Sequence, residues 1–459
     1  MEKRPLFRKL SPSSFIPIPV PVPGRVNRKD ERMVKAYSLR RLLFGLVCAA
    51  WLVFTASGCA DTTAGSSATE SSSTPDQLSS VPDNSSQSSD PVSYPEKEFD
   101  PVNPDLLYGV CYVQYSMSSR VDNATAAELI SGIGAKSVRV WNHITYIMDE
   151  NNNVSESAAA TYHELYKLLK DNGVEQIIGM SHFHFLDEKY FPNSDGWNST
   201  TWVPERDTTP GSEYMQFLAY YEQAWKTLAA EFPEVDCWEM GNEMNHDPFL
   251  NPINYTDGTN GVAPFSLMEK ADITTDMMFA AHKGIKAGNP DATTIMPAMA
   301  PVDGIYGVMM RQYLERIYEN IDSGEFGSTN SDDFFDALAW HLYANSEPDE
   351  DWVQVNLDLY AIAQAHGDDG KKVYLTEVGY PDSGNPVTDQ TQAEWVKEMY
   401  RLTKEELPFV ESIHYYRLFD DGADSYGLFR DPAVTGGKIS IKEKGRAYVE
   451  AAGGSGSFS

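Results

Sequence analysis

Cysteine is scarce in this chain, and the common sequence patterns of metal and nucleotide sites are missing. The 459 residues include four cysteines, and no two of them have the C-x-x-C spacing of a metal-ligand pair. No Gly-x-Gly-x-x-Gly follows the first candidate strand, where the run is Gly109-Val-Cys-Tyr-Val, and no Gly-x-Ser-x-Gly occurs. Nucleotide-dependent and serine-hydrolase chemistry therefore have no support, and we expect neither a cofactor nor a bound metal.

Positive charge is also in short supply outside the N-terminal region. Residues 1–58 hold eleven Lys/Arg and three Asp/Glu, a net charge of +8, so the total of −31 leaves −39 for residues 59–459. An acidic surface repels nucleic acid phosphates and anionic lipid headgroups, so we expect no nucleic acid partner. It suits a neutral ligand, although a role in solubility alone explains it equally well.

The N-terminal segment, residues 1–58, has the features of a secretory leader. Arg40-Arg41 precede the apolar run from Leu42 to Phe54, and small residues follow it. Ala56-Ser57-Gly58-Cys59 resembles a bacterial lipobox, which predicts lipidation of Cys59 and a cell-surface protein held on a bacterial membrane by its lipid anchor. An uncleaved membrane anchor and an ordinary signal peptide are the alternatives. Met33 would give a leader of ordinary length, so translation starting there is a further hypothesis.

Residues 59–100 are rich in Ser, Thr, Pro, Asp and Asn and nearly devoid of bulky apolar side chains. Such a segment buries too little surface to offset the entropy lost on ordering. We interpret it as a flexible linker that holds the following domain away from the membrane.

From residue 101 to 453, short apolar runs alternate with amphipathic helical stretches, a pattern typical of parallel β-α units. Eight runs qualify as strands: Leu107–Tyr112, Ser137–Trp141, Gln176–Ser181, Cys237–Asn242, Thr293–Ala298, Ala337–His341, Val373–Glu377 and Ser412–Tyr416. Eight strands favour a closed (β/α)8 TIM barrel over an open doubly wound sheet. Cys111 and Cys237 fall in these strands, where we expect small buried side chains rather than a disulfide. Residues 454–459 are predicted to form a flexible tail.

Polar and aromatic residues gather at the carboxyl ends of these runs, where the active site of a TIM barrel lies. The residues that we expect to contact a substrate there are Arg139, Trp141, His182, Asn242, His341, Tyr343 and Tyr416. His182 and His184 could equally serve packing, and a metal site is a weaker third interpretation. Aromatic residues of the long loops after the third and fourth strands, such as Trp202, are further candidates for sugar contacts.

Two glutamates, Glu243 and Glu377, each close a predicted strand at this face. They are 134 residues apart, or three β-α units, so their strands lie across the barrel mouth from each other. Cleavage of a glycoside with retention needs one carboxylic acid to protonate the leaving oxygen and one carboxylate to attack the anomeric carbon. A lone glutamate at a strand end is usually a solvated rim residue. Two on the right strands, with Asn242 immediately before one, favour catalysis.

The motifs Gly241-Asn242-Glu243, Trp340-His341-Leu342-Tyr343 and Thr376-Glu377, with Arg139, resemble glycoside hydrolase clan A, the retaining β-glycosidase barrels, and in particular families 5 and 39. The resemblance implies that Glu243 is the general acid/base and Glu377 the nucleophile. It implies that Asn242 binds the sugar 2-hydroxyl, that Arg139 and Tyr343 orient and ionise Glu377, and that His341 completes the network. Many clan members have Pro where Met244 stands and Trp at the end of the eighth strand.

The sequence thus predicts a monomeric, extracellular O-glycosyl hydrolase that acts on β-linked polysaccharide or oligosaccharide by double displacement. A non-catalytic carbohydrate-binding surface lipoprotein on the same barrel, and an inverting hydrolase, are the alternatives. The long loops favour an open cleft and internal cleavage of a chain.

Overall fold

The computed structural model describes residues 103–181, 201–253, 255, 262–301, 307–344, 346–383, 387–422 and 424–458. The predicted leader with Cys59, the linker, and the loop that carries His182 and His184 lie outside the described residues. In the part that is described, no helix combines the length and apolar character needed to cross a membrane.

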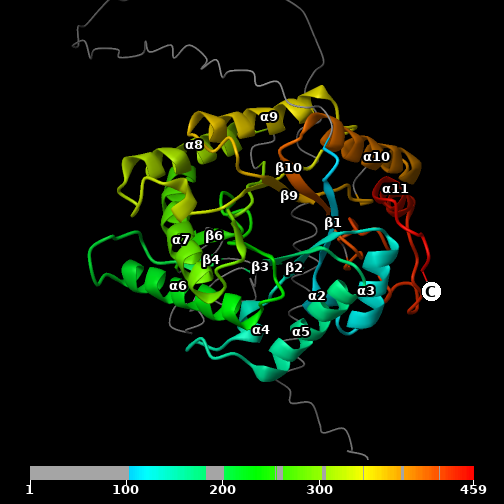
Figure 1. The fold of residues 1–459 in the computed structure, drawn as a ribbon, viewed down its shortest axis with the longest axis horizontal. Coiled ribbons are helices and arrows are strands. Elements are labelled where there is room, and N and C mark those ends of the chain that lie inside the picture. Colours follow the sequence, from blue (N-terminus) through cyan, green and yellow to red (C-terminus); the bar gives the residue numbers. More distant parts are fainter. Residues whose placement is uncertain are drawn as a thin grey trace, which may run out of the picture. The chain divides into compact units, whose positions relative to one another are not determined.

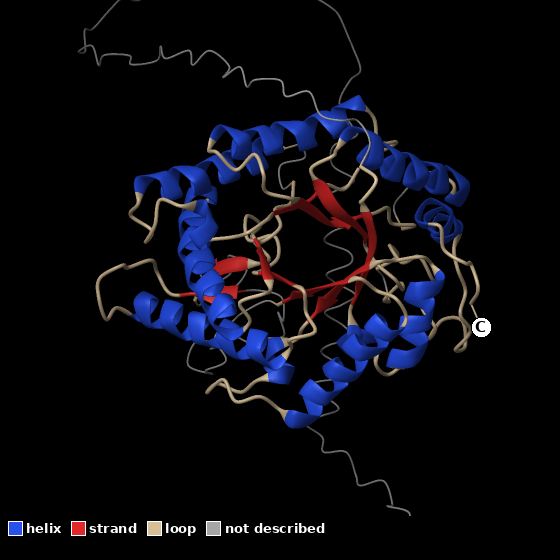
Figure 2. Ribbon diagram, in the orientation of Figure 1, coloured by secondary structure: helices blue, strands red, loops and turns tan. Residues whose placement is uncertain are grey.

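The described chain forms a (β/α)8 barrel. Eight parallel strands hydrogen-bond in the order β7-β5-β3-β2-β1-β10-β9-β8. Parallel bridges from Ile295 to Ala337 and from Met299 to Trp340 join the two ends of this series, β7 and β8. Figure 2 shows the strands as an inner ring with the helices around it. The barrel strands are β1 (Leu107–Tyr112), β2 (Ser137–Trp141), β3 (Gln176–Met180), β5 (Cys237–Glu239), β7 (Thr293–Ile295), β8 (Leu338–His341), β9 (Val373–Val378) and β10 (Val410–Tyr415).

The helices follow the strands in alternation, as the sequence pattern predicts (Figure 1). They are α2 (Gln114–Met117), α3 (Asn123–Gly132), α4 (Ile144–Ile147), α5 (Glu156–Asp171), α6 (Glu213–Glu231), α7 (Leu267–Gly288), α8 (Val308–Ser323), α9 (Glu350–Ala365), α10 (Asp389–Glu406) and α11 (Glu443–Ala452), with a short 3-10 helix η2 (Ser331–Asp333).

Side-chain caps define where several of these helices begin. Ser155, Ser212 and Thr388 each accept a hydrogen bond from a backbone N–H in the first turn of α5, α6 and α10. At α7, Ser266 and Glu269 form a complete capping box. These bonds satisfy donors that have no partner within the helix, so the boundaries agree with the polar residues before each apolar pattern.

One pair of strands was not predicted. β4 (Thr201–Val203) and β6 (Leu250–Pro252) pair in parallel, separately from the barrel, within the long segments that follow β3 and β5. Trp202, one of the aromatic loop candidates, is therefore part of a strand and is partly exposed.

The interior of the barrel is filled by side chains. Cys111 and Cys237 are buried and free, as expected. His414 of β10 lies across the barrel against Gly109 of β1, so closely that a Cβ at Gly109 would be 2.3 Å from His414 Cδ2. His414 Nε2 is 2.8 Å from the hydroxyl of Ser137. Burial lowers the pKa of His414 to about 3, so this ring is neutral and acts as core.

The C-terminal segment 454–458, expected as a tail, packs along the barrel. Gly456 donates a backbone hydrogen bond to Gly132 of α3 at 3.1 Å, and the ring of Phe458 lies edge-on to Phe429 with centroids 5.2 Å apart.

Candidate active site

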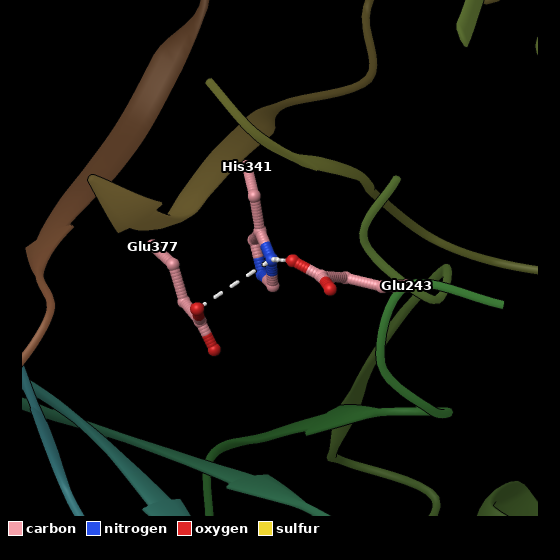
Figure 3. Close-up of side chains that lie close together, drawn as sticks. All are labelled: Glu243, His341 and Glu377. Carbon is pink, nitrogen blue, oxygen red and sulfur yellow. Dashed lines mark hydrogen bonds and ion pairs between the residues drawn. The ribbon is translucent and has the colours of Figure 1, made fainter. Parts of the chain in front are cut away.

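Three ionisable side chains converge at the mouth of the barrel, from three different strands (Figure 3). Glu377 belongs to β9, His341 is the last residue of β8, and Glu243 follows β5. His341 Nδ1 is 2.7 Å from Glu243 Oε1 and 3.7 Å from Glu377 Oε2. One oxygen of each glutamate lies within 4.8 Å of the other. The sequence therefore predicts correctly that the two carboxylates meet across the barrel mouth.

Arg139 of β2 is the centre of the charged network beneath this site. Its guanidinium is fully buried and donates to three acceptors. Nη1 donates to Glu377 Oε1 at 2.6 Å, and Nη2 donates to Asn242 Oδ1 at 2.7 Å. Nε and Nη2 hold Glu239 at 2.6 and 3.0 Å. The planar fork of arginine suits such a task, because its N–H groups diverge in fixed directions.

Glu377 is held as a carboxylate. Besides the bond from Arg139, its Oε2 accepts a hydrogen bond from the Tyr343 hydroxyl at 2.6 Å. Burial raises the pKa of Glu377, but the charges of His341 and Arg139 and the two hydrogen bonds outweigh it, so the pKa lies below its ordinary value. The pKa of Tyr343 is far above its usual range because of burial and the adjacent Glu377 charge, so its hydroxyl remains a donor. An ionised, oriented carboxylate is what a nucleophile requires.

Glu243 is the more open of the two glutamates, with 14% of its side chain exposed against 7% for Glu377. Its partner His341 is buried, which lowers the pKa of the imidazole, but the charges of Glu377 and Glu243 raise it above the ordinary value. Proton exchange with a ligand at the barrel mouth is therefore available to Glu243, with His341 directly behind it.

The second nitrogen of His341 fixes the proton arrangement. Nε2 is 3.1 Å from the Thr376 hydroxyl, and that hydroxyl donates to Glu239 Oε1 at 3.4 Å. Because the threonine proton is directed at a carboxylate, its oxygen accepts from Nε2–H. A single mobile proton is then shared between His341 Nδ1 and Glu243, which suits a group that gives up and recovers a proton.

Glu243, His341 and Glu377 are also close enough together to bind a metal ion. Glu377, however, already accepts from Arg139 and Tyr343, and the guanidinium at 2.6 Å would repel a cation. This donor set is better suited to proton transfer than to metal binding.

The other predicted contact residues lie around this centre. Asn242 is buried, and its bond to Arg139 fixes the orientation of its carboxamide. Trp141 ends β2 and is partly exposed. The ring of Tyr416 is 6.4 Å from that of Tyr343, and its hydroxyl donates to Asp424 at 3.1 Å. His182 lies outside the described residues.

Three members of the site were missed by sequence reasoning. Glu239 is a fully buried carboxylate, Thr376 links it to His341, and Tyr426 has its ring 5.6 Å from both Tyr343 and Tyr416. Glu239 could have been found, because a charged residue inside the apolar run Cys237-Trp238-Glu239-Met240 must have a buried partner. Nothing in the sequence indicates the loop residue Tyr426.

Comparison with known families agrees with this site. The family model described as Cellulase (glycosyl hydrolase family 5) matches residues 101–408, well over half of the chain. The chain belongs to glycosyl hydrolase family 5. The chain is a glycosidase of clan A, and a search of curated proteins finds no match to it.

Solved structures with the same fold come from families 39, 5 and 1. A family 39 glycoside hydrolase from Bacteroides cellulosilyticus WH2 is 18% identical, with a TM-score of 0.52 over 78% of this chain. This chain spans 65% of that protein. GH5_18 from Streptomyces cattleya, in complex with Manb1-4GlcNAc, is 16% identical over 76% of this chain and 80% of its own, with a TM-score of 0.52. A beta-glucosidase from Thermotoga maritima is 13% identical over 77% and 99%, with a TM-score of 0.52. At these identities the likeness concerns the fold.

Proposed function

We propose that this family 5 enzyme cleaves β-linked polysaccharide or oligosaccharide with retention of anomeric configuration, by double displacement. The observation that carries the proposal is the distance between the two carboxylates. Retaining glycosidases hold theirs about 5–5.5 Å apart, whereas inverting enzymes need roughly 6.5–9.5 Å to admit a water molecule. One oxygen of Glu243 and one of Glu377 lie within 4.8 Å of each other, which favours retention.

In the first step, Glu377 attacks the anomeric carbon and forms a glycosyl-enzyme bond. The bond to the leaving oxygen breaks, and Glu243 supplies the proton that this oxygen needs. In the second step, water gives a proton to Glu243 while its oxygen bonds to the anomeric carbon, and the bond to Glu377 breaks. Arg139 and Tyr343 receive the negative charge that returns to Glu377, and Asn242 is placed to bind the sugar hydroxyl next to the anomeric centre.

The direct test is the configuration of the first-formed product. A panel of β-1,4-glucan, β-mannan, β-xylan and aryl β-glycosides would be digested, and the best substrate would be followed by proton NMR before mutarotation. We expect the β-anomer first. Initial appearance of the α-anomer would indicate an inverting enzyme instead. No turnover across the panel, with saturable binding to one glycan, would indicate the carbohydrate-binding alternative.

Replacement of either glutamate separates their roles. Glu377→Gln should abolish turnover of every glycoside, because no other described carboxylate at the mouth can attack the anomeric carbon. Glu243→Gln should retain activity on glycosides whose leaving groups need no proton. Undiminished hydrolysis in both Glu243→Ala and Glu377→Ala would refute the assignment.

We also propose that the enzyme is a lipoprotein of a bacterial cell surface, anchored through Cys59. The support is the run Ala56-Ser57-Gly58-Cys59 after an apolar segment, followed by the Ser/Thr-rich linker. Cells that express the full chain should incorporate labelled palmitate into it, and Cys59→Ala should abolish the incorporation. Label that survives this substitution would contradict the proposal.

A further inference from the structure

The acid/base residue sits in an unusual backbone conformation. Glu243 has φ = +44°, and Asn152 is the other non-glycine residue with positive φ that the structure describes. Side chains with a Cβ are strained in the left-handed region, so the surroundings must hold Glu243 there. The turn that begins here carries the backbone away from the barrel while the carboxylate faces His341 at 2.7 Å.

The segment Ala298–Ala300, just beyond β7, holds this turn from one side. The backbone N–H of Glu243 donates to the Ala298 carbonyl at 2.8 Å. Two residues later the main chain has left the ladder, and the side chain of Asn245 takes its place. Asn245 Nδ2 donates to the Ala300 carbonyl at 2.7 Å, and the Ala300 N–H donates to Asn245 Oδ1 at 3.1 Å. The carboxamide thus pairs with Ala300 as a peptide group of a neighbouring strand would, and it is almost completely buried.

The same segment holds His341 from its other side. The His341 backbone N–H donates to the Met299 carbonyl at 2.7 Å, and Met299 bridges to Trp340. Alternate residues of this short strip therefore fix the acid/base residue and the histidine behind it. A movement of the strip relative to residues 243–245 would change the distance between the Glu243 carboxylate and the imidazole.

We propose that Asn245 is a positioning residue for general acid/base catalysis, whose carboxamide locks the left-handed turn at Glu243 to the strip that carries His341. The inference rests on the proposed role of Glu243 and adds a residue that touches neither the substrate nor the reacting atoms. Asn245 acts only on protonation of the leaving group and activation of water, because Arg139 and Tyr343 hold Glu377 from elsewhere.

This separation gives a distinctive kinetic prediction. Asn245→Asp keeps the size of the side chain and the acceptor Oδ1, but it replaces the donor to Ala300 by an oxygen that the carbonyl repels. For an aryl β-glycoside of the glycone preferred in the panel, kcat/KM with phenolate as leaving group should fall about 10- to 100-fold, part of the factor that general acid catalysis supplies. With 2,4-dinitrophenolate, which leaves without a proton, kcat/KM should fall less than about threefold. Azide, which needs no general base, should raise kcat on the dinitrophenyl substrate.

Asn320→Asp is the matched control, because Asn320 is an equally buried asparagine in α8 whose amide donates to Asp272 and Thr275. It should change the two substrates by the same factor. Equal losses on both substrates in Asn245→Asp, with a normal melting temperature, would overturn the proposal. If the variant is poorly folded, Asn245→Ala measured at low temperature must show the same leaving-group discrimination or the proposal fails. If Glu243→Gln itself shows no discrimination, the assignment of the general acid is wrong, and the fault lies with the proposed function.

Discussion

The Tyr343 hydroxyl offers a quantitative test of how Glu377 is kept ionised. It donates to Glu377 Oε2 at 2.6 Å, and Tyr343→Phe removes this bond with little change in shape. A hydrogen bond to a charged group contributes about 1.5–3 kcal/mol. One pKa unit corresponds to about 1.36 kcal/mol, so the bond could be worth roughly one to two units. Arg139 and His341 still favour the charged form, so we expect a rise of about one unit in the pKa of Glu377.

The acid limb of the pH profile of kcat/KM reports this pKa in the free enzyme. Because the nucleophile must be ionised, a higher pKa moves the limb toward higher pH in Tyr343→Phe. A 2,4-dinitrophenyl glycoside is the suitable substrate, since its leaving group needs no proton and the limb is then set by the nucleophile. Below the limb the variant should lose activity relative to the wild type, and the gap should narrow as the pH rises.

Tyr380→Phe is the control for this experiment. The Tyr380 hydroxyl donates to the Ser346 carbonyl at 3.1 Å, so its removal should leave the acid limb where it is. An acid limb in Tyr343→Phe that coincides with that of the wild type would refute the reasoning. It would mean that Arg139 and the His341 charge alone determine the ionisation of Glu377.

Three further predictions concern the interior, the proton network and the outer helices. Gly109→Ala should lower the free energy of unfolding in urea by about 1–3 kcal/mol, because the new methyl group overlaps the His414 ring. Thr376→Val, which lacks the hydroxyl that accepts from His341 Nε2–H, should shift the basic limb of kcat/KM on a phenyl glycoside, whereas Thr376→Ser should preserve it. His163 lies between two glutamates at the end of α6, which raise its pKa although burial opposes them. Its contribution to stability is therefore complete below the ordinary histidine pKa and is lost as the pH rises through the raised value, which thermal unfolding of His163→Gln across pH 5–9 checks.

The strands could be predicted because their side chains are buried on both faces, which leaves continuous apolar runs. β1 and β2 agree with the predicted bounds residue for residue. The runs from Cys237 and Thr293 end earlier than predicted, at Glu239 and Ile295. Positive φ angles at Gly241 (141°) and Glu243 (44°) turn the backbone out of the ladder there, and pairing returns only as a bridge from Asn242 to Ala298. Hydropathy does not register a change of φ, so such ends cannot be read from an apolar pattern.

The catalytic pair could be predicted for a different reason. In a β/α barrel the carboxyl end of every strand points to the same face, so a chemistry-bearing residue at a strand end has its location fixed by topology alone. Contacts made by loops have no such constraint. The pairing of β4 with β6 joins segments about 50 residues apart, Thr201 with Leu250, and neither segment has a pattern that names its partner.

Glu239 shows what a residue-by-residue interpretation leaves out. The guanidinium of Arg139 has two carboxylates and a carboxamide as acceptors, and Glu239 takes both Nε and one Nη2 bond. That bidentate pair fixes the plane of the fork, so Nη1 can face only Glu377. It also neutralises part of the charge that would otherwise act on the nucleophile alone. A nucleophile must be ionised, but a carboxylate held by an unshared buried cation would be a weaker attacking group. The buried Glu239 thus lets one arginine orient Glu377 without binding its charge too strongly.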